Sequence, residues 1–329
     1  MRVAVIGCGG AGAQHIRTYQ GIEGVELVGL CDLDAARANK HAEATGARPY
    51  GRIDEMLTAE KPDLISVCTN EYLHVEPAIQ VLQAGVNVFC EKPMAHTVDE
   101  GRRMVAAARV AGKVLGVDYN YRHIPAFRAL REEMDRGTFG EVLLVDISAH
   151  AFCYHHSIDL IRFLLGDVAE VSATVNDVQE RRSFPWHTPE EFLYVPSLAV
   201  AATLRMRSGA TVVLTASRMR DLGDTLLNIE VVGTKGRCAL RSLPVNDARP
   251  RHVETWPRNE ALATRFAGEA GAPPFGLNDA FTASITAFVK AIEAGQPVPT
   301  DGAAGVAVLV IEQAVVHAHR FGTAVRLLG

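Results

Sequence analysis

Three glycines at G-x-G-x-x-G spacing, with an acid twenty residues further on, are the residues of this chain most suited to bind a ligand. Gly7, Gly9 and Gly12 follow the short apolar run 3–6, and Asp32 closes the second apolar run. A glycine turn between a strand and a helix lets the backbone approach a pyrophosphate, which the helix N-terminus attracts. An acid after the second strand bonds the ribose hydroxyls. The pattern predicts a dinucleotide site, and an ordinary βα turn without a ligand is its alternative.

The acid also favours NAD over NADP. The Asp32 carboxylate pairs with a ribose 2′-hydroxyl and repels a 2′-phosphate. The next residue is Leu33 rather than an arginine that would receive that phosphate. Arg37 and Lys40 lie one or two helical turns further on and keep NADP open as the less favoured cofactor. The expected cofactor loop consists of Gly7, Gly9, Gly10, Ala11 and Gly12.

The elements that must position these residues alternate between strand and helix patterns over residues 1–120. Short apolar runs separated by helical stretches of about 10–15 residues predict a parallel, doubly wound sheet of the Rossmann type. Ligands of such sheets bind beyond the carboxyl ends of the strands. The polar residues expected at those ends are Asp32, Asn70, Lys92 and Asp118.

After residue 120 the pattern changes to longer segments with alternating apolar and polar residues. Such segments, joined by turns like Ser208-Gly209, predict a large open, mostly antiparallel sheet. We expect an N-terminal Rossmann domain over 1–120 and a C-terminal α+β domain over 121–329. The apolar helix predicted at 305–320 is expected to pack back toward the N-terminal domain. Residues 244–276, rich in Pro, Arg and Gly, are predicted to form a surface loop.

Composition narrows the class of protein. A chain of 329 residues with 48% hydrophobic and 22% charged residues is typical of a globular protein with two domains. A net charge of −5 gives no electrostatic footprint for nucleic acid or an anionic membrane. No apolar run reaches about 18 residues, and the first strand leaves no room for a signal peptide. The six cysteines include no CxxC pair, so we expect a cytoplasmic protein without disulfides or a membrane partner.

Motifs spread over nearly the whole chain resemble those of one family. The matching pieces are the GCGGAG loop at 7–12, Asp32, Thr69-Asn70 with His74, Glu91-Lys92-Pro93, the GVDYNYR stretch at 116–122, and the HxxD pattern of His156 and Asp159. Together they resemble the glucose–fructose oxidoreductase and inositol dehydrogenase family (Gfo/Idh/MocA). The resemblance implies NAD(P)-linked hydride transfer to or from a secondary alcohol of a sugar, sugar nucleotide or cyclitol. It also implies homodimer or homotetramer contacts through the C-terminal sheet.

The resemblance assigns the proton chemistry to Lys92 and His156. The matching lysine contacts the substrate oxygen and helps to relay its proton, and a partly desolvated lysine suits that task. Imidazole titrates near neutral pH and can take or return the proton. Asp159, three residues further along the helix, is expected to orient His156. His155 competes with His156 for the same role.

The rest of the expected site follows from the same resemblance. Asn70, His74 and Glu91 line the nicotinamide ribose, and the cofactor contacts are completed by Leu33, Thr69 and Lys92. Aromatic and hydroxyl-bonding side chains suit a polyol substrate. The expected substrate-binding residues are Asp118, Tyr119, Tyr121, Arg122, His150 and Tyr154, with His123 and Trp186 as further candidates.

One position departs from the family pattern. Inositol dehydrogenase-like members have an aspartate four residues before the histidine, where this chain has Phe152. Either the Lys92–His156 pair works without it, or Asp118 or Tyr154 supplies the missing group. The departure bears on an inositol-like substrate more than on the redox chemistry.

The stretch around Phe152 also contains side-chain types that bind zinc. His150, Cys153, and His155 or His156 are closely spaced, but a strand leaving a sheet scatters such groups and no fourth ligand is evident. We therefore predict no metal site. Two other functions stay open: an imine or enone reductase of the same fold, and a dinucleotide-binding sensor without turnover.

Overall fold

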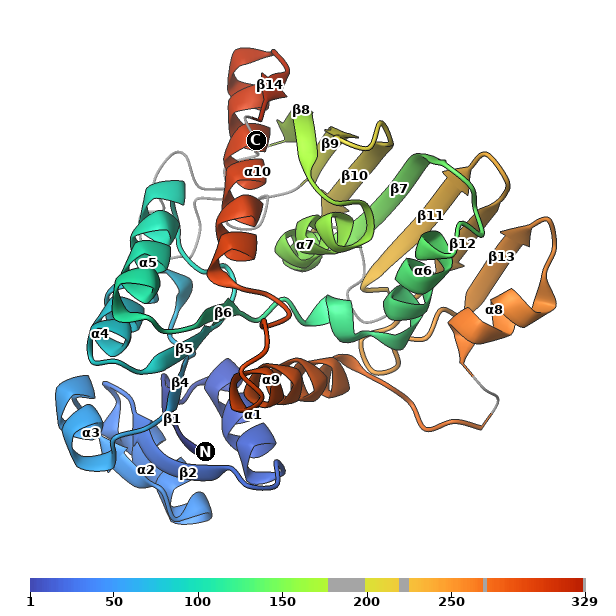
Figure 1. The fold of residues 1–329 in the computed structure, drawn as a ribbon. Coiled ribbons are helices and arrows are strands. Elements are labelled where there is room, and N and C mark those ends of the chain that lie inside the picture. Colours follow the sequence, from blue (N-terminus) through green and yellow to red (C-terminus); the bar gives the residue numbers. More distant parts are fainter. Residues whose placement is uncertain (177–198, 219–224, 269–270, 328–329) are drawn as a thin grey trace. The chain divides into compact units, whose positions relative to one another are not determined.

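The computed structural model describes residues 1–176, 199–218, 225–268 and 271–327, drawn as a ribbon in Figure 1. The chain forms two compact units. The first contains Met1–Tyr119 and Phe281–Leu309, and the second contains Asn120–Ala280 and Val310–Gly329. The chain thus returns to the first unit at 281–309, a stretch that the sequence analysis assigned to the C-terminal domain. Trp186 lies outside the described residues.

The first unit is built on a six-stranded sheet in the order β3-β2-β1-β4-β5-β6. Every neighbouring pair is parallel, which confirms the predicted Rossmann sheet. The strands are β1 (Arg2–Ile6), β2 (Glu26–Cys31), β3 (Arg48–Tyr50), β4 (Leu64–Val67), β5 (Asn87–Cys90) and β6 (Leu115–Val117). β3 was not predicted, because a three-residue edge strand with a central proline carries no periodic signal. All carboxyl ends lie along one edge, so the loops that follow the strands meet there.

The helices of this unit are α1 (Gly10–Gln20), α2 (Ala35–Thr45), α3 (Ile53–Glu60), α4 (Val75–Gln83), α5 (Val98–Ala111) and most of α9 (Leu277–Glu293), with the short 3₁₀ turn η1 (Glu71–Leu73). Local chemistry sets several boundaries. The Asp34 side chain caps α2, and Thr97 and Glu100 form a capping box at the start of α5. The ring of Phe288 in α9 stacks on Phe89 in β5 at 4.3 Å. That burial of large aromatic surface explains why α9 belongs to the first unit.

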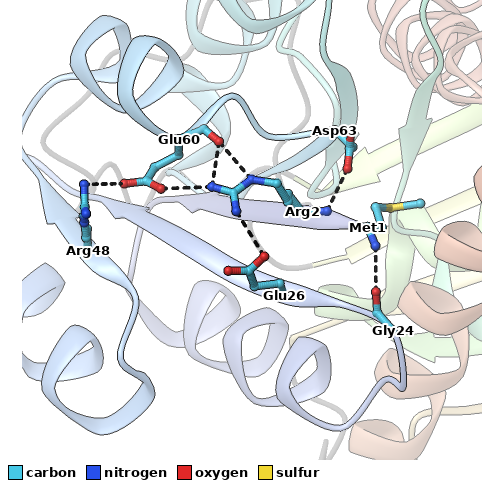
Figure 2. A network of polar contacts seen from close by, with 7 residues as sticks. All are labelled: Met1, Arg2, Gly24, Glu26, Arg48, Glu60 and Asp63. Atoms are coloured by element: carbon cyan, nitrogen blue, oxygen red, sulfur yellow. Dashed lines mark hydrogen bonds and ion pairs between the residues drawn. The ribbon is translucent and has the colours of Figure 1, made fainter.

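A polar network ties together the amino ends of the strands, opposite to the edge where ligands are expected (Figure 2). The Arg2 guanidinium donates to the main-chain oxygen of Glu60 at 2.9 and 3.1 Å and pairs with the Glu26 carboxylate at 3.0 Å. The main-chain N–H of Arg2 donates to Asp63 at 2.7 Å. Arg48 approaches the nearly buried Glu60 carboxylate at 3.6 Å. These contacts fix the start of β1, whose other end runs into the glycine loop.

The second unit is built on an eight-stranded sheet in the order β13-β12-β11-β7-β10-β9-β8-β14. Its strands are β7 (Val142–His150), β8 (Val168–Asn176), β9 (Ala199–Met206), β10 (Thr211–Ser217), β11 (Leu227–Gly233), β12 (Arg237–Arg241), β13 (His252–Trp256) and β14 (Val325–Arg326). Only the β7–β10 pair among them is parallel, which confirms a mostly antiparallel sheet. Gly209 turns β9 into β10 with φ of 97°, as the Ser208-Gly209 pair predicted.

The prediction of a surface loop over 244–276 is wrong. This stretch contains β13, which pairs with β12, and helix α8 (Glu260–Ala267), which begins at the capping side chain of Asn259. Every residue of β13 is at least partly exposed. An edge strand with no buried face shows no apolar alternation, so the usual strand signal is missing.

The helical elements of the second unit are η2 (Asn120–His123), α6 (Pro125–Asp135), η3 (Ala151–Cys153) and α7 (Tyr154–Leu165), besides α8 and the later part of α10 (Gly302–Phe321). Residues 302–309 of α10 count with the first unit and its remainder with the second. Among the described helices, α10 alone is long and apolar enough to cross a membrane by length and composition. About half of its apolar 18-residue stretch, 56%, is buried, as in the core helix of a globular protein.

Candidate functional site

The glycine loop after β1 has the close packing that its sequence predicted. Gly7 has φ of 88°, and a Cβ there would lie 2.6 Å from the Cys68 oxygen. A Cβ on Gly12 would lie 1.8 Å from the Gly7 oxygen, so only glycine lets α1 pack this closely. Gly9 and Gly10 have open space around the equivalent position, and α1 begins with no side-chain cap. The loop therefore leaves unpaired N–H groups and room for a phosphate.

Asp32 lies at the end of β2, beside this loop. Its Oδ2 accepts the main-chain N–H of Cys8 at 2.8 Å, and its Oδ1 accepts that of Asp34 at 2.8 Å. Each carboxylate oxygen keeps a second lone pair for a ribose hydroxyl. The Arg37 guanidinium lies 3.9 Å from Oδ1, whereas the adjacent Leu33 is 90% exposed.

The loop after β4 carries the next predicted cofactor residues. The Thr69 hydroxyl donates to the Leu73 oxygen at 3.1 Å, and the Asn70 amide donates to the Tyr72 hydroxyl at 3.1 Å. His74 is buried, with its ring nitrogens 2.9 Å from the Pro93 oxygen and 3.0 Å from the Thr69 oxygen. His74 therefore braces the loop after β4 against the loop after β5.

Lys92 and Glu91 follow β5, next along the same edge. The Lys92 main-chain N–H donates to the Glu91 carboxylate at 3.2 Å. Glu91 is buried, and Lys92 is half-buried. The loop thus holds an ammonium group beside a buried carboxylate, at the strand ends where a Rossmann sheet binds its ligand.

Behind Lys92 lies a buried cluster of three titratable side chains. The Nε2 atom of His15, on α1, lies 3.1 Å from a Glu91 oxygen and 3.7 Å from Asp118 Oδ2. The other ring nitrogen bonds the Ser66 hydroxyl at 2.9 Å. Asp118 Oδ1 accepts the Ser284 hydroxyl of α9 at 2.6 Å. Asp118, expected to contact substrate, is fully buried inside the first unit.

The two carboxyl groups of this cluster shift in opposite directions. Burial raises the pKa of Glu91, but the His15 hydrogen bond and charge, with Lys92 and His74, outweigh it and leave the pKa below its usual range. For Asp118, burial and then the Glu91 charge raise the pKa to about 7, against His15, Ser284 and Lys92. Two buried carboxylates this close do not both ionise at the same pH.

His156 and Tyr121 form a stacked pair in the second unit. Their ring centroids are 4.3 Å apart, with 8° between the ring planes. The Tyr121 hydroxyl donates to the Cys153 sulfur at 2.9 Å, and burial raises its pKa. The stack restricts rotation of the His156 imidazole.

Asp159, expected to orient His156, makes a strong contact with another residue. The Arg122 guanidinium donates to both of its carboxylate oxygens, at 2.7 and 2.6 Å. Asp159 is fully buried, and burial raises the pKa of its carboxyl while Arg122 and then Arg162 lower it. Arg122 also lies over the Phe163 ring at 5.5 Å. Two predicted site residues, Arg122 and Asp159, are thus paired with each other.

His155 faces a different partner from His156. Its Nδ1 bonds the Glu312 carboxylate of α10, and both side chains are buried. Tyr154 is fully buried, and its hydroxyl has no hydrogen-bond partner among the described residues. His150 caps η3, where its Nδ1 accepts the Phe152 N–H at 3.0 Å.

Both units match models of a single family. Residues 1–119 match "Oxidoreductase family, NAD-binding Rossmann fold" (GFO_IDH_MocA), and residues 151–239 match "GFO/IDH/MocA C-terminal domain". The chain belongs to the GFO/IDH/MocA family. The first unit is therefore an NAD-binding Rossmann domain, as the glycine loop and Asp32 predicted.

The names of several relatives in this family specify sugars or cyclitols as their substrates. D-glucoside 3-dehydrogenase of Escherichia coli strain K12 is 37% identical over 46% of this chain, a match that spans only 44% of that relative. Inositol 2-dehydrogenase 3 of Saccharopolyspora erythraea is 28% identical over 91% of this chain and 95% of its own length. A levoglucosan dehydrogenase solved with NADH and levoglucosan shares the fold, with a TM-score of 0.83 and 21% identity, over 100% of this chain and 99% of that one.

Phe152 stands where inositol dehydrogenase-like members of the family have an aspartate, and no other carboxylate takes the place of that aspartate among the described residues. Its side chain is 42% exposed on η3, and the buried acid next to this region, Glu312, bonds His155 instead.

The side chains of residues 150–156 do not come together as a set of metal ligands. Among the described residues, His15, Glu91 and Asp118 alone bring three such ligand atoms within 4.8 Å of one another.

The sequence analysis missed His15, Ser66, Ser284 and Glu312. His15 lies three residues after Gly12, on the face of α1 that the sheet buries. A titratable side chain on a buried helix face is unusual and could have identified His15 as a candidate. Glu312 is an acid within an otherwise apolar stretch of α10, which was a similar signal. Ser66 and Ser284 carry no local signal, because their role depends on which residues the fold brings beside them.

Proposed function

We propose that this protein is an NAD-dependent oxidoreductase that transfers a hydride between nicotinamide and a secondary alcohol or ketone of a sugar, sugar nucleotide or cyclitol. The observation that carries the proposal is the place of Lys92. It follows β5 on the same sheet edge as the glycine loop and Asp32, within an NAD-binding Rossmann domain. That edge brings an ammonium group to the side of the sheet where the cofactor binds.

Bound NAD⁺ supplies the hydride acceptor, and NADH supplies the donor for the reverse reaction. As the alcohol carbon loses its hydride, the O–H bond must also break for the C=O bond to form. The Lys92 amine accepts that proton in the oxidative direction and returns it in the reductive direction. The main-chain bond to Glu91 holds the loop that carries it.

His156 is the second proton-transfer residue of the proposal. Its stack on Tyr121 fixes the plane of the imidazole, a group that can take and return a proton. Asp159 acts indirectly: bound to Arg122, it anchors α7 to η2, and so sets where His156 lies along α7.

The substrate class rests on relatives and on the residue types of the second unit. The named relatives dehydrogenate a glucoside and inositol. Among the predicted substrate-binding residues, Arg122 and His150 are partly exposed, and their hydrogen-bonding side chains suit a polyol. Phe152, which has no carboxylate to bind a hydroxyl, favours a sugar over an inositol.

We also propose a homo-oligomer and a cytoplasmic location. β7 of the eight-stranded sheet has exposed apolar side chains on opposite faces, Leu143 at 50% and Leu144 at 39%. Such side chains suit contact with a second copy. All six cysteines are free and buried, as a reducing compartment allows.

A cofactor and substrate screen tests the proposal. Purified protein is offered sugars, sugar nucleotides and inositols with NAD⁺, and the corresponding ketones with NADH, and absorbance of NADH is followed. We expect turnover of at least one neutral polyol or its ketone. NADH binding without turnover of any compound would instead support a sensor, and turnover confined to imines or enones would support the reductase alternative.

A further inference from the structure

The side chain of Asn120 is buried with both of its polar atoms unpaired. Asn120 is 0% exposed, and neither its amide nitrogen nor its amide oxygen has a hydrogen-bond partner among the described residues. It is the one buried side chain in the described part of the chain with two such atoms. Nearly all buried polar groups of folded proteins are paired, because an unpaired one loses its hydration without compensation. Such an exception is expected at a functional site.

Asn120 begins η2, and the two residues that follow it hold η2 on α7. The ring of Tyr121 stacks on His156, and the Arg122 guanidinium donates to both carboxylate oxygens of Asp159. These contacts leave the main chain at Asn120 little freedom, so its amide is pre-organised. They also place Asn120 next to the residue whose ring stacks on the proposed proton-transfer histidine, inside the second unit.

The side of η2 that does not contact α7 carries a second unpaired polar group. Side chains three residues apart in a 3₁₀ helix lie on one side, so Asn120 and His123 share a face. His123 is partly exposed, but its Nε2 atom is buried and has no hydrogen-bond partner among the residues that the structure describes. A substrate that binds beside His123 can therefore come within reach of the Asn120 amide.

The groups on this face suit an uncharged polyol. The amide donates through Nδ2 and accepts through Oδ1. Burial, and then the charges of Arg128 and Arg122, lower the pKa of His123 to about 4, so its ring is neutral at neutral pH. A hydroxyl group both donates and accepts, so neighbouring hydroxyls can satisfy every one of these atoms. A phosphate or carboxylate only accepts and would leave the amide oxygen unpaired.

We propose that Asn120 is a specificity-determining residue whose amide bonds two hydroxyl groups on neighbouring carbons of the substrate. Nδ2 donates to one hydroxyl oxygen, and Oδ1 accepts from the other hydroxyl. Because the nitrogen and the oxygen of an amide share one carbon, they match a vicinal diol. This inference rests on the proposed function, because the ligand that it describes is the polyol substrate.

Deoxy analogues of the polyol identified by the substrate screen test this role. In wild type, loss of one hydroxyl of the pair should lower kcat/KM about 100-fold, because a buried amide atom then stays unpaired. In Asn120→Leu the same loss should lower kcat/KM by less than about threefold, and the Kd for NADH should stay within about threefold of wild type. Equal discrimination by the two proteins would overturn the inference.

The carboxamide of nicotinamide also pairs a donor with an acceptor, so the affinity for NADH is an independent readout. A Kd for NADH that rises about tenfold or more in Asn120→Leu would assign the amide to the cofactor and overturn its role in substrate specificity. No turnover of any polyol by wild type would contradict the proposed function. Turnover with unchanged discrimination in Asn120→Leu would contradict this inference alone.

Urea unfolding tests the unpaired state of the amide without a substrate. Asn120→Leu removes two unpaired atoms and keeps a similar branched shape, so its midpoint should equal or exceed that of wild type. Asn87 is the matched control, because its amide donates to the Asp63 oxygen at 2.9 Å and accepts the Val114 N–H at 3.0 Å, at the amino end of β5. Asn87→Leu should lower the midpoint.

Alanine variants at both positions show whether overpacking by leucine affects the comparison. Asn120→Ala should unfold at a higher urea concentration than Asn87→Ala, because only Asn87 loses hydrogen bonds. Midpoints lowered equally at both positions, in the leucine and the alanine pair, would show that the Asn120 amide is already satisfied in the free protein and would overturn the inference.

Discussion

The Arg122 guanidinium donates to both carboxylate oxygens of Asp159, at 2.6 and 2.7 Å, inside the second unit. Asp159 is fully buried, so Arg122 supplies the charge that compensates it. The pair joins η2 to α7, the two elements that also bring Tyr121 onto His156. A bidentate, buried pair of this kind is expensive to break by removing one partner.

Arg122→Ala is expected to destabilise the protein by about 3–5 kcal/mol, because it leaves a buried carboxylate unpaired. Arg122→Lys keeps the charge but loses one of the two bonds, and its effect should be smaller. Urea unfolding measures both. The matched control is Arg258→Ala, which breaks an ion pair whose side chains are 87% and 82% exposed and should leave the midpoint nearly unchanged. Equal midpoints for Arg122→Ala and wild type would show that the pair contributes no stability.

Lys92→Ala is expected to lower kcat by a factor of about 100 or more and to leave the Kd for NADH within about threefold of wild type. The physical reason is that alanine removes the proton acceptor at the strand ends but leaves the glycine loop and Asp32 intact. Steady-state absorbance of NADH and fluorescence titration give the two quantities. Lys290→Ala, an exposed lysine of α9, is the control for loss of a positive charge. Near-normal turnover of Lys92→Ala would remove Lys92 from the site.

Asp32→Asn is expected to reduce the preference for NADH over NADPH by about tenfold, because asparagine no longer repels a 2′-phosphate. Wild type should bind NADH more tightly. Asp34→Asn removes a neighbouring, half-exposed negative charge but keeps a side-chain cap on α2, so its cofactor preference should match wild type. Equal affinity of wild type for both cofactors would refute the role of Asp32.

The sequence predicted the part of the fold in which strands and helices alternate regularly. Strand and helix patterns over 1–120 found the Rossmann sheet, because buried parallel strands are continuous apolar runs. Strand β13 was not predicted, because an exposed edge strand has no buried face and so no apolar alternation. Helix α9 could not be assigned to its unit from periodicity alone. The stack of Phe288 on Phe89, residues about 200 positions apart, decides that assignment and leaves no local trace.

The same contrast holds for the candidate site. The glycine loop, Asp32 and Lys92 stand in contiguous motifs, so spacing could identify them. His15 meets Asp118 only through the packing of α1 against the sheet. Asp118 was expected to face the substrate because it follows a strand, yet Ser284 and His15 hold it in the interior. Position along the chain predicts the edge a residue reaches, but not the direction of its side chain.

The stability of the protein should decrease as pH rises from about 4 to about 7 on account of Asp118. Burial, and then the Glu91 charge, raise its pKa from the usual 3.8 to about 7 in the folded state. Between these values the folded state binds more protons than the unfolded chain, so the free energy of unfolding falls with rising pH. Asp118→Asn removes this titration and should flatten the dependence. Urea midpoints across the range measure it, and identical slopes for both proteins would contradict the shift.

Replacement of the two adjacent histidines of α7 should affect different properties, kcat for His156 and stability for His155. His156→Phe keeps a ring to stack on Tyr121 but cannot exchange a proton, so kcat should fall about 100-fold with little change in stability. His155→Phe leaves the Glu312 carboxylate buried without its partner, so stability should fall by about 1–3 kcal/mol while kcat changes less. Turnover and urea unfolding of both variants, prepared side by side, measure the contrast. The reverse outcome, a larger loss of kcat in His155→Phe, would make the His155–Glu312 pair the proton-transfer group. Glu312 of α10 would then supply the carboxylate that inositol dehydrogenase-like members of the family have four residues before their histidine.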